Sequence, residues 1–237
     1  MTLKNVSAIL FDSGKVLNGP KTGHWFMGPR FFEYVNREVF EKIDSSIINQ
    51  AFTKAGSYIN SIHLIETMNE EFDYFKHYYT IFSGVLPDLK LSEDKVKRLA
   101  EDLVFNPSKY VFYRDALKVI PILSEKYPLA IVSDAWPSLE MVFEEAKMKS
   151  YFSSFVISSK IGVIKPDKLM YQTALNELGV NPNQAVFIDD NLRNCLGAKA
   201  LGIQVILLCR DKEQYQLEKM KSAEKGYEVI SLLEELL

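Results

Sequence analysis

The chain has 237 residues, of which 47% are hydrophobic and 25% charged, and its formal net charge is −3 at pH 7. This composition is typical of a globular protein and excludes a disordered or fibrous chain. Because binding to polyphosphate needs a concentrated basic surface, the acidic balance argues against a nucleic-acid partner, while a small phosphorylated ligand remains compatible with it.

Cysteine content and hydropathy favour a cytoplasmic location. The two cysteines, Cys195 and Cys209, are too few for a disulfide scaffold and lack the C-x-x-C spacing of a zinc site. The N-terminal stretch MTLKNVSAILF carries one lysine and a short apolar run, so we expect neither a signal peptide nor a membrane anchor. Other apolar segments are too short to span a bilayer, and we expect no membrane partner.

The first predicted element is a buried strand over residues 8–11. Its apolar run, AILF, ends abruptly at Asp12 and is followed by Ser13 and Gly14. A strand of this kind delivers a carboxylate to its C-terminal end, where open α/β sheets bind ligands. Taken alone, Asp12 could equally cap a helix or open a turn.

Residues 18–107 are predicted to form a mostly helical insert. The stretch NGPKTGHWFMGPR, which contains His24 and Trp25, is rich in Gly and Pro and is expected to be an irregular loop. From about residue 29 to 105, mixed apolar and charged residues indicate about four amphipathic helices, with breaks near 44, 56–60 and 87–91. We assign most of the aromatic residues in this region to the core of a helix bundle.

From Tyr110 onward, helices and strands alternate. We expect strands at 129–132, 155–158, 185–188 and 205–208, and a short edge strand near 227–230. The intervening helices are expected at 115–126, where Pro121 should kink or divide the helix, and at 137–147, 168–178 and 192–201. This order predicts right-handed βαβ units and an α/β, Rossmann-like parallel sheet with helices on both faces. The core domain then comprises 1–17 and 108–237, and a helical-bundle cap domain at 18–107 is inserted after the first strand.

Polar residues follow the C-terminal ends of several predicted strands. Because these ends lie along one edge of a parallel sheet, the residues should converge on a single crevice. Together they supply a nucleophile, a hydroxyl, a cation and an acidic pair, which is the set that phosphoryl transfer to a carboxylate requires. The residues are Asp12, Ser133, Asp134, Lys165, Asp189 and Asp190.

Four motifs occur in order along the chain: FDSGKVL, IVSDA, IGVIKPDKLMY and FIDDNLRNCLGAKALGI. On these motifs the chain resembles the haloacid dehalogenase-like (HAD) superfamily, and the helical insert lies where that family carries a C1-type cap. The FxDDN pattern and the glycine at position 14 resemble the branch of the α-glucose-1-phosphate phosphatases and the N-terminal phosphatases of epoxide hydrolases. The resemblance implies a hydrolase that works through an aspartyl-phosphate.

The resemblance also implies roles for the strand-end residues. Asp12 would be the nucleophile, and Ser133 would hydrogen-bond a phosphoryl oxygen, with Asp134 beside it in the substrate site. Lys165 would neutralise the negative charge that Asp12, the phosphate and the acidic pair bring together.

A magnesium site is implied by the same resemblance. Asp190 aligns with the metal-binding aspartate, and Asp189 would be a further ligand or would orient Lys165. Asp12 and the main-chain carbonyl of Gly14 would complete the protein ligands. Hard oxygen donors of this kind suit Mg²⁺, which keeps several waters and takes a substrate phosphate as a ligand.

Gly14 departs from the pattern of most phosphatases in the superfamily, which carry a second aspartate there as general acid and base. Its absence points to substrates with acidic leaving groups, such as anomeric sugar phosphates, aryl phosphates or acyl phosphates. Lys15 and His24 are the nearby candidates for a substitute proton donor. His24 and Trp25, in the loop between core and cap, are candidates for substrate specificity.

The leading interpretation is therefore a magnesium-dependent phosphatase of small phosphorylated metabolites, of the sugar 1-phosphate type. One alternative is a 2-haloacid dehalogenase, in which an aspartate displaces halide without a metal. Another is a catalytically degenerate member that binds a ligand without turnover. The glycine at position 14, where most phosphatases of the superfamily carry an aspartate, suggests this alternative. The acidic pair Asp189-Asp190 argues against the first alternative, and the retention of Asp12, Ser133 and Lys165 argues against the second.

Overall fold

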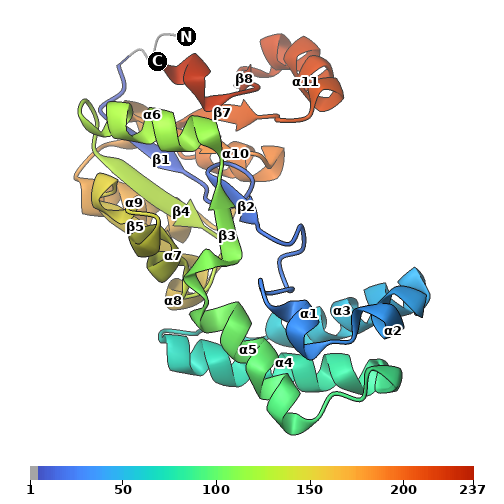
Figure 1. Cartoon of the computed structure of the whole chain (residues 1–237). Coiled ribbons are helices and arrows are strands. Elements are labelled where there is room, and N and C mark those ends of the chain that lie inside the picture. The colour runs from blue at the N-terminus through green and yellow to red at the C-terminus, as the bar shows by residue number, and fades with distance from the viewer. Residues whose placement is uncertain (1–4) are drawn as a thin grey trace. The chain divides into compact units, whose positions relative to one another are not determined.

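The computed structural model describes residues 5–237, which divide into two compact units (Figure 1). The core unit comprises the chain up to Gly19, Phe112–Ala135 and Phe143–Leu237, and the helical unit comprises Pro20–Val111 and Trp136–Val142. Residues 1–4, part of the stretch for which the sequence predicts no signal peptide, lie outside the described residues. Within the described part of the chain, no helix is long and apolar enough to cross a membrane.

The core unit is built on a six-stranded parallel sheet in the order β5-β4-β1-β6-β7-β8. The central strands consist almost entirely of buried residues, as expected where helices cover both faces of a parallel sheet. The predicted Rossmann-like α/β fold is therefore confirmed, with the short C-terminal strand at one edge. The strands are β1 (Ala8–Phe11), β4 (Leu129–Ser133), β5 (Ser154–Ile157), β6 (Ala185–Asp189), β7 (Gln204–Leu208) and β8 (Glu228–Ile230).

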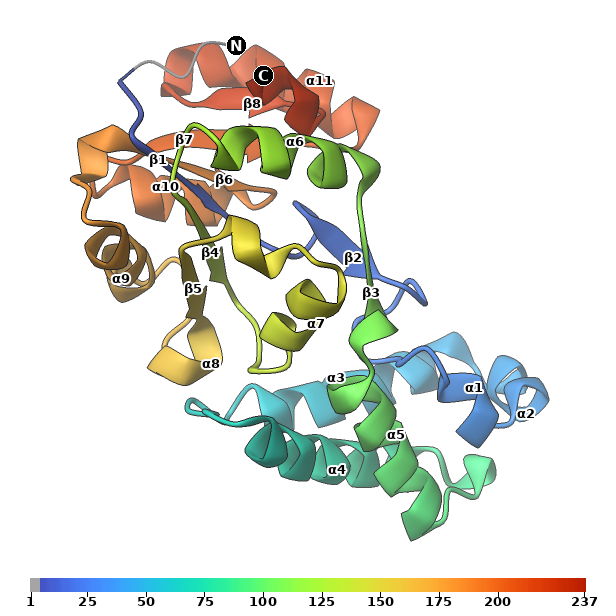
Figure 2. The same cartoon turned by 60° about the vertical axis from the view of Figure 1, so that its left-hand side comes forward.

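Helices lie on both faces of this sheet (Figures 1 and 2). Helix α9 (Lys168–Leu178) contacts β4 and β5, and α10 (Leu192–Lys199) contacts β6 and β7. Helix α6 (Arg114–Ser124) lies on the opposite face, where it contacts the C-terminal turn η5 (Leu233–Leu236). Pro121 lies inside α6 without dividing it. The remaining core elements are η3 (Lys149–Tyr151), α8 (Ser158–Ile161), which the sequence did not predict, η4 (Pro182–Gln184) and α11 (Lys212–Lys225).

Strand alternation and helix capping explain how α9 is placed on the sheet. Side chains on a strand alternate between faces, so Leu10 and Phe187 point to the same face and pack against Tyr171 of α9 in one apolar cluster. Helix α9 begins after Asp167, whose carboxylate accepts a hydrogen bond from Leu169 N, and ends at Gly179. Gly179 has a φ of 66°, a left-handed conformation that favours glycine at a helix end.

The helical unit contains five helices, with N-caps at the expected starts of α3 and α5. Asp44 caps α3 and Ser92 caps α5, whereas α3 continues through Gly56, so the break expected at 56–60 begins only at Asn60. Nine aromatic residues of this unit lie in or pack against one apolar cluster, as expected for the core of a helix bundle. The elements are α1 (Phe31–Tyr34), α2 (Arg37–Lys42), α3 (Ser45–Ile59), α4 (Met68–Val85), η1 (Pro87–Leu89), α5 (Glu93–Phe105) and η2 (Pro107–Lys109). The aromatic residues are Phe31, Phe32, Tyr34, Phe72, Tyr74, Phe75, Tyr78, Tyr79 and Phe82.

The chain passes between the units through two short strands, β2 (Asn18–Pro20) and β3 (Tyr110–Phe112), which pair as a separate sheet. The prediction of an irregular loop after residue 17 is therefore wrong for Asn18–Pro20, which form a strand. The domain boundaries expected at 17/18 and 107/108 lie next to these strands. One segment differs from the expected division: Trp136–Val142, expected in the core domain, groups with the helical unit, and α7 (Leu139–Glu145) begins there.

Candidate active site

Strand register places the predicted nucleophile beside the acidic pair. Phe11 of β1 is aligned with Ile188 of β6 on one side and with Ile131 of β4 on the other. The next residue, Asp12, donates its backbone N–H to Ile188 O at 2.9 Å, so it lies level with Asp189 at the C-terminal edge of the sheet.

A buried lysine joins two of the carboxylates. Lys165 Nζ lies 2.8 Å from Asp12 Oδ1 and 2.8 Å from Asp189 Oδ2, and its side chain is 1% exposed. Burial lowers the pKa of Lys165, but the carboxylates of Asp12, Asp189 and Asp134 outweigh burial and raise its pKa overall. The lysine is therefore held fully charged between the two aspartates.

Asp189 is held by donors on both oxygens. Its Oδ2 accepts from Lys165 Nζ and, at 3.1 Å, from Asn194 Nδ2, while its Oδ1 accepts from Asn191 N at 2.7 Å. Burial and the charge of Asp12 raise the pKa of Asp189 to about 7, against the opposing effect of Lys165. This arrangement fixes Asp189 rigidly, as a residue that orients Lys165 requires.

Asp190 is more accessible than Asp189 and faces the loop after β1. Its side chain is 27% exposed, and its Oδ2 lies 3.6 Å from Lys15 Nζ. Burial and the charge of Asp12 raise the pKa of Asp190. Asp134, after β4, accepts a hydrogen bond from Lys165 N at 2.8 Å, and burial raises its pKa as well.

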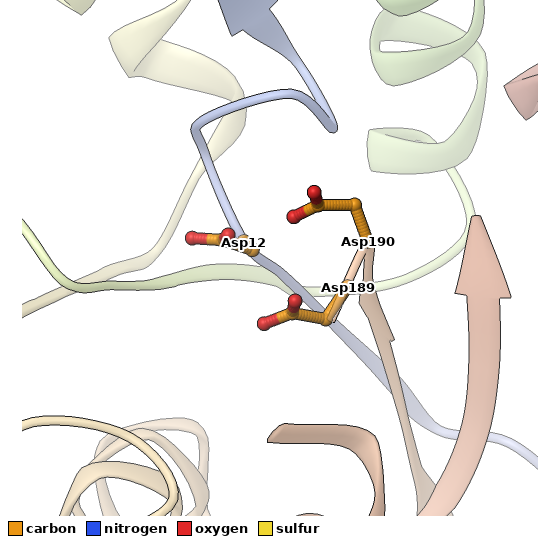
Figure 3. A group of neighbouring side chains, drawn as sticks. All are labelled: Asp12, Asp189 and Asp190. Atoms are coloured by element: carbon orange, nitrogen blue, oxygen red, sulfur yellow. The ribbon is translucent and has the colours of Figure 1, made fainter. Parts of the chain in front are cut away.

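The three carboxylates form a group that could hold a metal ion (Figure 3). Asp12, Asp189 and Asp190 each offer an oxygen, and these oxygens lie within 4.8 Å of one another. In Figure 3 their carboxyl groups gather beyond the ends of the two strands. Hard oxygen donors that carry more negative charge than Lys165 can balance fit a divalent cation such as Mg²⁺.

The loop after Asp12 folds back on itself. Ser13 N donates to Asp12 Oδ1 at 2.7 Å, and Ser13 Oγ accepts from Asn18 Nδ2 at 2.8 Å. Lys15 N donates to Asn18 O at 2.7 Å, and Lys15 has a φ of 59°, a left-handed conformation that few residues other than glycine adopt. Gly14 therefore lies in a tight, hydrogen-bonded loop.

The other predicted site residues divide between the units. Ser133 ends β4 and is buried in the core unit, on the strand next to Asp12. His24 and Trp25 belong to the helical unit. There the His24 ring lies 4.1 Å from the Phe52 ring, and His24 Nδ1 accepts a hydrogen bond from Phe26 N at 3.2 Å. Burial lowers the pKa of His24, and Trp25 packs edge-on against Tyr110.

Sequence reasoning missed the residues that hold Asp189 in place. Asn194 is buried on α10, and its amide donates to Asp189, while Asn191 caps α10 and donates its backbone N–H to the same side chain. Both lie in the motif FIDDNLRNCLGAKALGI. A polar residue on the sheet-facing side of an amphipathic helix is the pattern that could have identified Asn194.

Curated relatives include both dehalogenases and phosphatases. An (S)-2-haloacid dehalogenase from Pseudomonas sp. (strain CBS-3) is 29% identical over 150 residues, which are 63% of this chain and 62% of the relative. A phosphoserine phosphatase from Thermus thermophilus is 25% identical over 133 residues, 55% of this chain and 53% of the relative. The chain thus spans less than two thirds of the length of either relative.

Solved structures share the fold at low identity. An L-2-haloacid dehalogenase from Xanthobacter autotrophicus aligns with a TM-score of 0.61 and 18% identity, covering 96% of this chain and 95% of the other. A magnesium-bound HAD-hydrolase, YfnB from Bacillus subtilis, aligns with a TM-score of 0.64 and 14% identity, covering 97% and 96%. The family model for haloacid dehalogenase-like hydrolases matches residues 30–208, which is more than half of the chain. The chain therefore belongs to the haloacid dehalogenase-like hydrolase family, as its four motifs predict.

Proposed function

We propose that this protein is a magnesium-dependent phosphatase of small phosphorylated metabolites, of the sugar 1-phosphate type, which acts through an aspartyl-phosphate on Asp12. The observation that carries the proposal is the carboxylate group itself: oxygens of Asp12, Asp189 and Asp190 lie within 4.8 Å of one another around a single buried lysine. Phosphatases and dehalogenases both occur among the relatives, so the choice between the two activities rests on the chemistry of the site residues.

Charge favours the phosphatase over the dehalogenase. A 2-haloacid is itself an anion, and with no metal it would enter a site whose carboxylates outnumber Lys165. A phosphate ester is still more negative, but it comes with a divalent cation that offsets both its own charge and that of the aspartates. The excess of carboxylate is thus useful in the metal-dependent reaction and costly in the metal-free one.

The residues of the chain divide the reaction between them. An Asp12 oxygen attacks phosphorus, the bond between phosphorus and the ester oxygen breaks, and the leaving oxygen takes a proton; water then cleaves the aspartyl-phosphate and releases inorganic phosphate. Lys165 holds Asp12 in place and balances charge, and Ser133 donates a hydrogen bond to a phosphoryl oxygen. Asp134 fixes the backbone of Lys165. The bound cation would be held by Asp12, Asp190 and the carbonyl of Gly14, and it would neutralise charge on the phosphoryl group.

Gly14 limits the substrates that this site can process quickly. A positioned general acid contributes about two to four powers of ten, and Gly14 has no side chain to supply one. Of the two substitute donors considered, His24 has its Nδ1 engaged by Phe26 N and packs against Phe52 in the helical unit. Lys15 lies 3.6 Å from Asp190 on the loop beside Asp12. Substrates whose leaving group is acidic, such as anomeric sugar phosphates, need the least help.

Substrate choice is assigned to the helical unit, with His24 and Trp25 as the residues to test. A metabolite-sized substrate suits a family member with such a unit, because caps of this kind exclude large substrates. We also propose a cytoplasmic location, which the two free, buried cysteines support.

Phosphate release from an aryl phosphate and a panel of sugar phosphates, with and without Mg²⁺, tests the proposal. Asp12→Asn should abolish turnover, whereas Asp94→Asn, the same change at a side chain 73% exposed on α5, should not alter it. Faster release from 1-phosphates than from 6-phosphates is expected. Chloride release from 2-chloropropionate that needs Asp12 but no metal, with no phosphate release from any ester, would establish the dehalogenase instead.

A further inference from the structure

Arg210 lies just after the carboxyl end of β7 and contacts the loop that follows Asp12. Its Nε donates to Lys15 O at 3.1 Å, and its Nη2 donates to Val16 O at 2.7 Å. One guanidinium group thus binds two consecutive carbonyls of this loop, 195 residues away in the sequence. Its planar fork of donors suits such a contact, and a lysine could not reproduce it.

The other side of the same guanidinium is anchored in the core. Nη1 and Nη2 bind the two oxygens of Asp115 at 2.9 and 3.0 Å, and the Asp115 side chain is 5% exposed. Asp115 also accepts from Leu233 N at 2.9 Å, which ties it to the C-terminal turn. Arg210 Cζ lies 4.0 Å from the centre of the Tyr113 ring. The ring therefore contacts the face of the guanidinium, while the hydrogen bonds restrain its edges.

The hydrogen bonds from Arg210 restrain the part of the loop that carries Gly14 O. The Gly14 carbonyl and the Lys15 N–H belong to one planar peptide group, and Lys15 N donates to Asn18 O at 2.7 Å. Arg210 holds the next carbonyl, Lys15 O, so the groups on both sides of the Lys15 Cα are fixed. Since Lys15 is in the left-handed region, its backbone needs outside contacts to stay there.

We propose that Arg210 is a positioning residue, which holds the Ser13–Leu17 loop in the shape that directs Gly14 O and Lys15 toward the carboxylate group. The inference rests on the proposed function for its consequence, because Gly14 O is the main-chain ligand assigned there. Asp115 neutralises Arg210 by a bidentate ion pair, so the arginine serves the loop rather than the phosphate. Residues that orient metal ligands from outside are worth about 10- to 100-fold in metal affinity or activity.

Arg210→Lys tests the proposal, because it keeps the positive charge opposite Asp115 and removes the guanidinium donors that bind Lys15 O and Val16 O. Hydrogen exchange at the amides of Lys15, Leu17 and Asn18 should speed up by about tenfold or more in the metal-free protein, since each donates within the loop. The dissociation constant for Mg²⁺, measured by calorimetry, should rise about 10- to 100-fold. We expect kcat to fall while KM changes less, because the loop holds Gly14 O and Lys15, which are assigned to the reaction, whereas substrate choice is assigned to the helical unit.

Two control variants separate positioning from general destabilisation. Arg98→Lys alters an arginine that pairs with Asp94 and Glu101 at the surface of α5, and it should change none of these readouts. Val229→Ala removes methyl groups from the core cluster beside β7, and should lower Tm without changing loop exchange or Mg²⁺ affinity.

Unchanged loop exchange in Arg210→Lys would overturn the proposal, and so would an equal loss of Mg²⁺ affinity in Val229→Ala. The exchange measurement needs neither metal nor substrate. A wild-type protein that neither binds Mg²⁺ nor releases phosphate would therefore refute the proposed function separately, and the exchange rates would still decide whether Arg210 holds the loop.

Discussion

Replacing Lys165 with methionine removes the one buried cation from the carboxylate group. In the wild type, Lys165 Nζ lies 2.8 Å from oxygens of both Asp12 and Asp189. At an effective dielectric constant of about 20, each such contact is worth about 6 kcal/mol of attraction. Burying the ammonium group cancels much of this attraction, and the loss of one partner from a buried ion pair typically costs about 3–5 kcal/mol. We expect that loss in the free energy of unfolding at pH 8.

The loss should shrink as the pH falls. In the wild type, the raised pKa of Lys165 means that its stabilising contribution is fully present below the unfolded value of 10.5. In the variant, the pKa of Asp189, already raised to about 7, rises further because Lys165 no longer lowers it. A carboxyl group whose pKa is higher in the folded state than in the unfolded state stabilises the fold when it is protonated. Lys165→Met therefore recovers part of its stability between about pH 8 and pH 5.

Urea unfolding at pH 8 and at about pH 5.5, with chelator to exclude metal, measures both effects. Lys97→Met removes a lysine that pairs with Glu101 at the surface of α5, and it should change stability little at either pH. Lys165→Met should also lose phosphatase activity. A variant as stable as wild type at pH 8, or one whose deficit stays the same at both pH values, would refute the electrostatic account of this site.

Three further predictions concern Gly14, the acidic pair and the helical unit. Gly14→Asp should raise phosphate release from an alkyl phosphate by about tenfold or more and change an aryl phosphate little, because an acid helps poor leaving groups most; equal changes would contradict the role given to Gly14. Calorimetry should show Mg²⁺ affinity falling as the pH drops through about 7, because protonation of Asp189 removes a negative charge from the carboxylate group, and a constant affinity would contradict that pKa. Glu71→Gln should destabilise the protein by about 3 kcal/mol, because it removes the carboxylate that forms an ion pair with the buried Lys109 at 3.9 Å. Chemical denaturation of Glu71→Gln beside Glu41→Gln, at an exposed pair with Arg37, measures this, and equal losses would count against it.

The sequence was sufficient to predict the sheet and its C-terminal edge. Strands such as β1 and β6 are continuous apolar runs that end in Asp12 and Asp189, and a parallel sheet has only one edge at which such ends can meet. Strands β2 and β3 were missed because three residues are too few to show a period of two.

Contacts between distant parts of the chain could not be predicted in the same way. Ser138 lies in a predicted helix of the core domain, yet its backbone and hydroxyl bind Glu71, 67 residues away, inside the helical unit. Arg210 likewise finds its partners on the loop after Asp12. A local pattern indicates that such residues are polar, but only the fold identifies the groups they bind.

The glycine at position 14 and the hydrogen bonds from Arg210 both affect the conformation of the loop after Asp12. A family member with an aspartate at this position has a side chain that can adjust its rotamer, whereas Gly14 offers only a backbone carbonyl. A carbonyl can be aimed only by fixing the peptide plane that carries it, and here that plane is fixed by the hydrogen bond from Lys15 N to Asn18 O and by the arginine on the next carbonyl. The shape of the loop therefore matters to the reaction, because it sets where the Gly14 carbonyl and the Lys15 side chain lie relative to the carboxylate group.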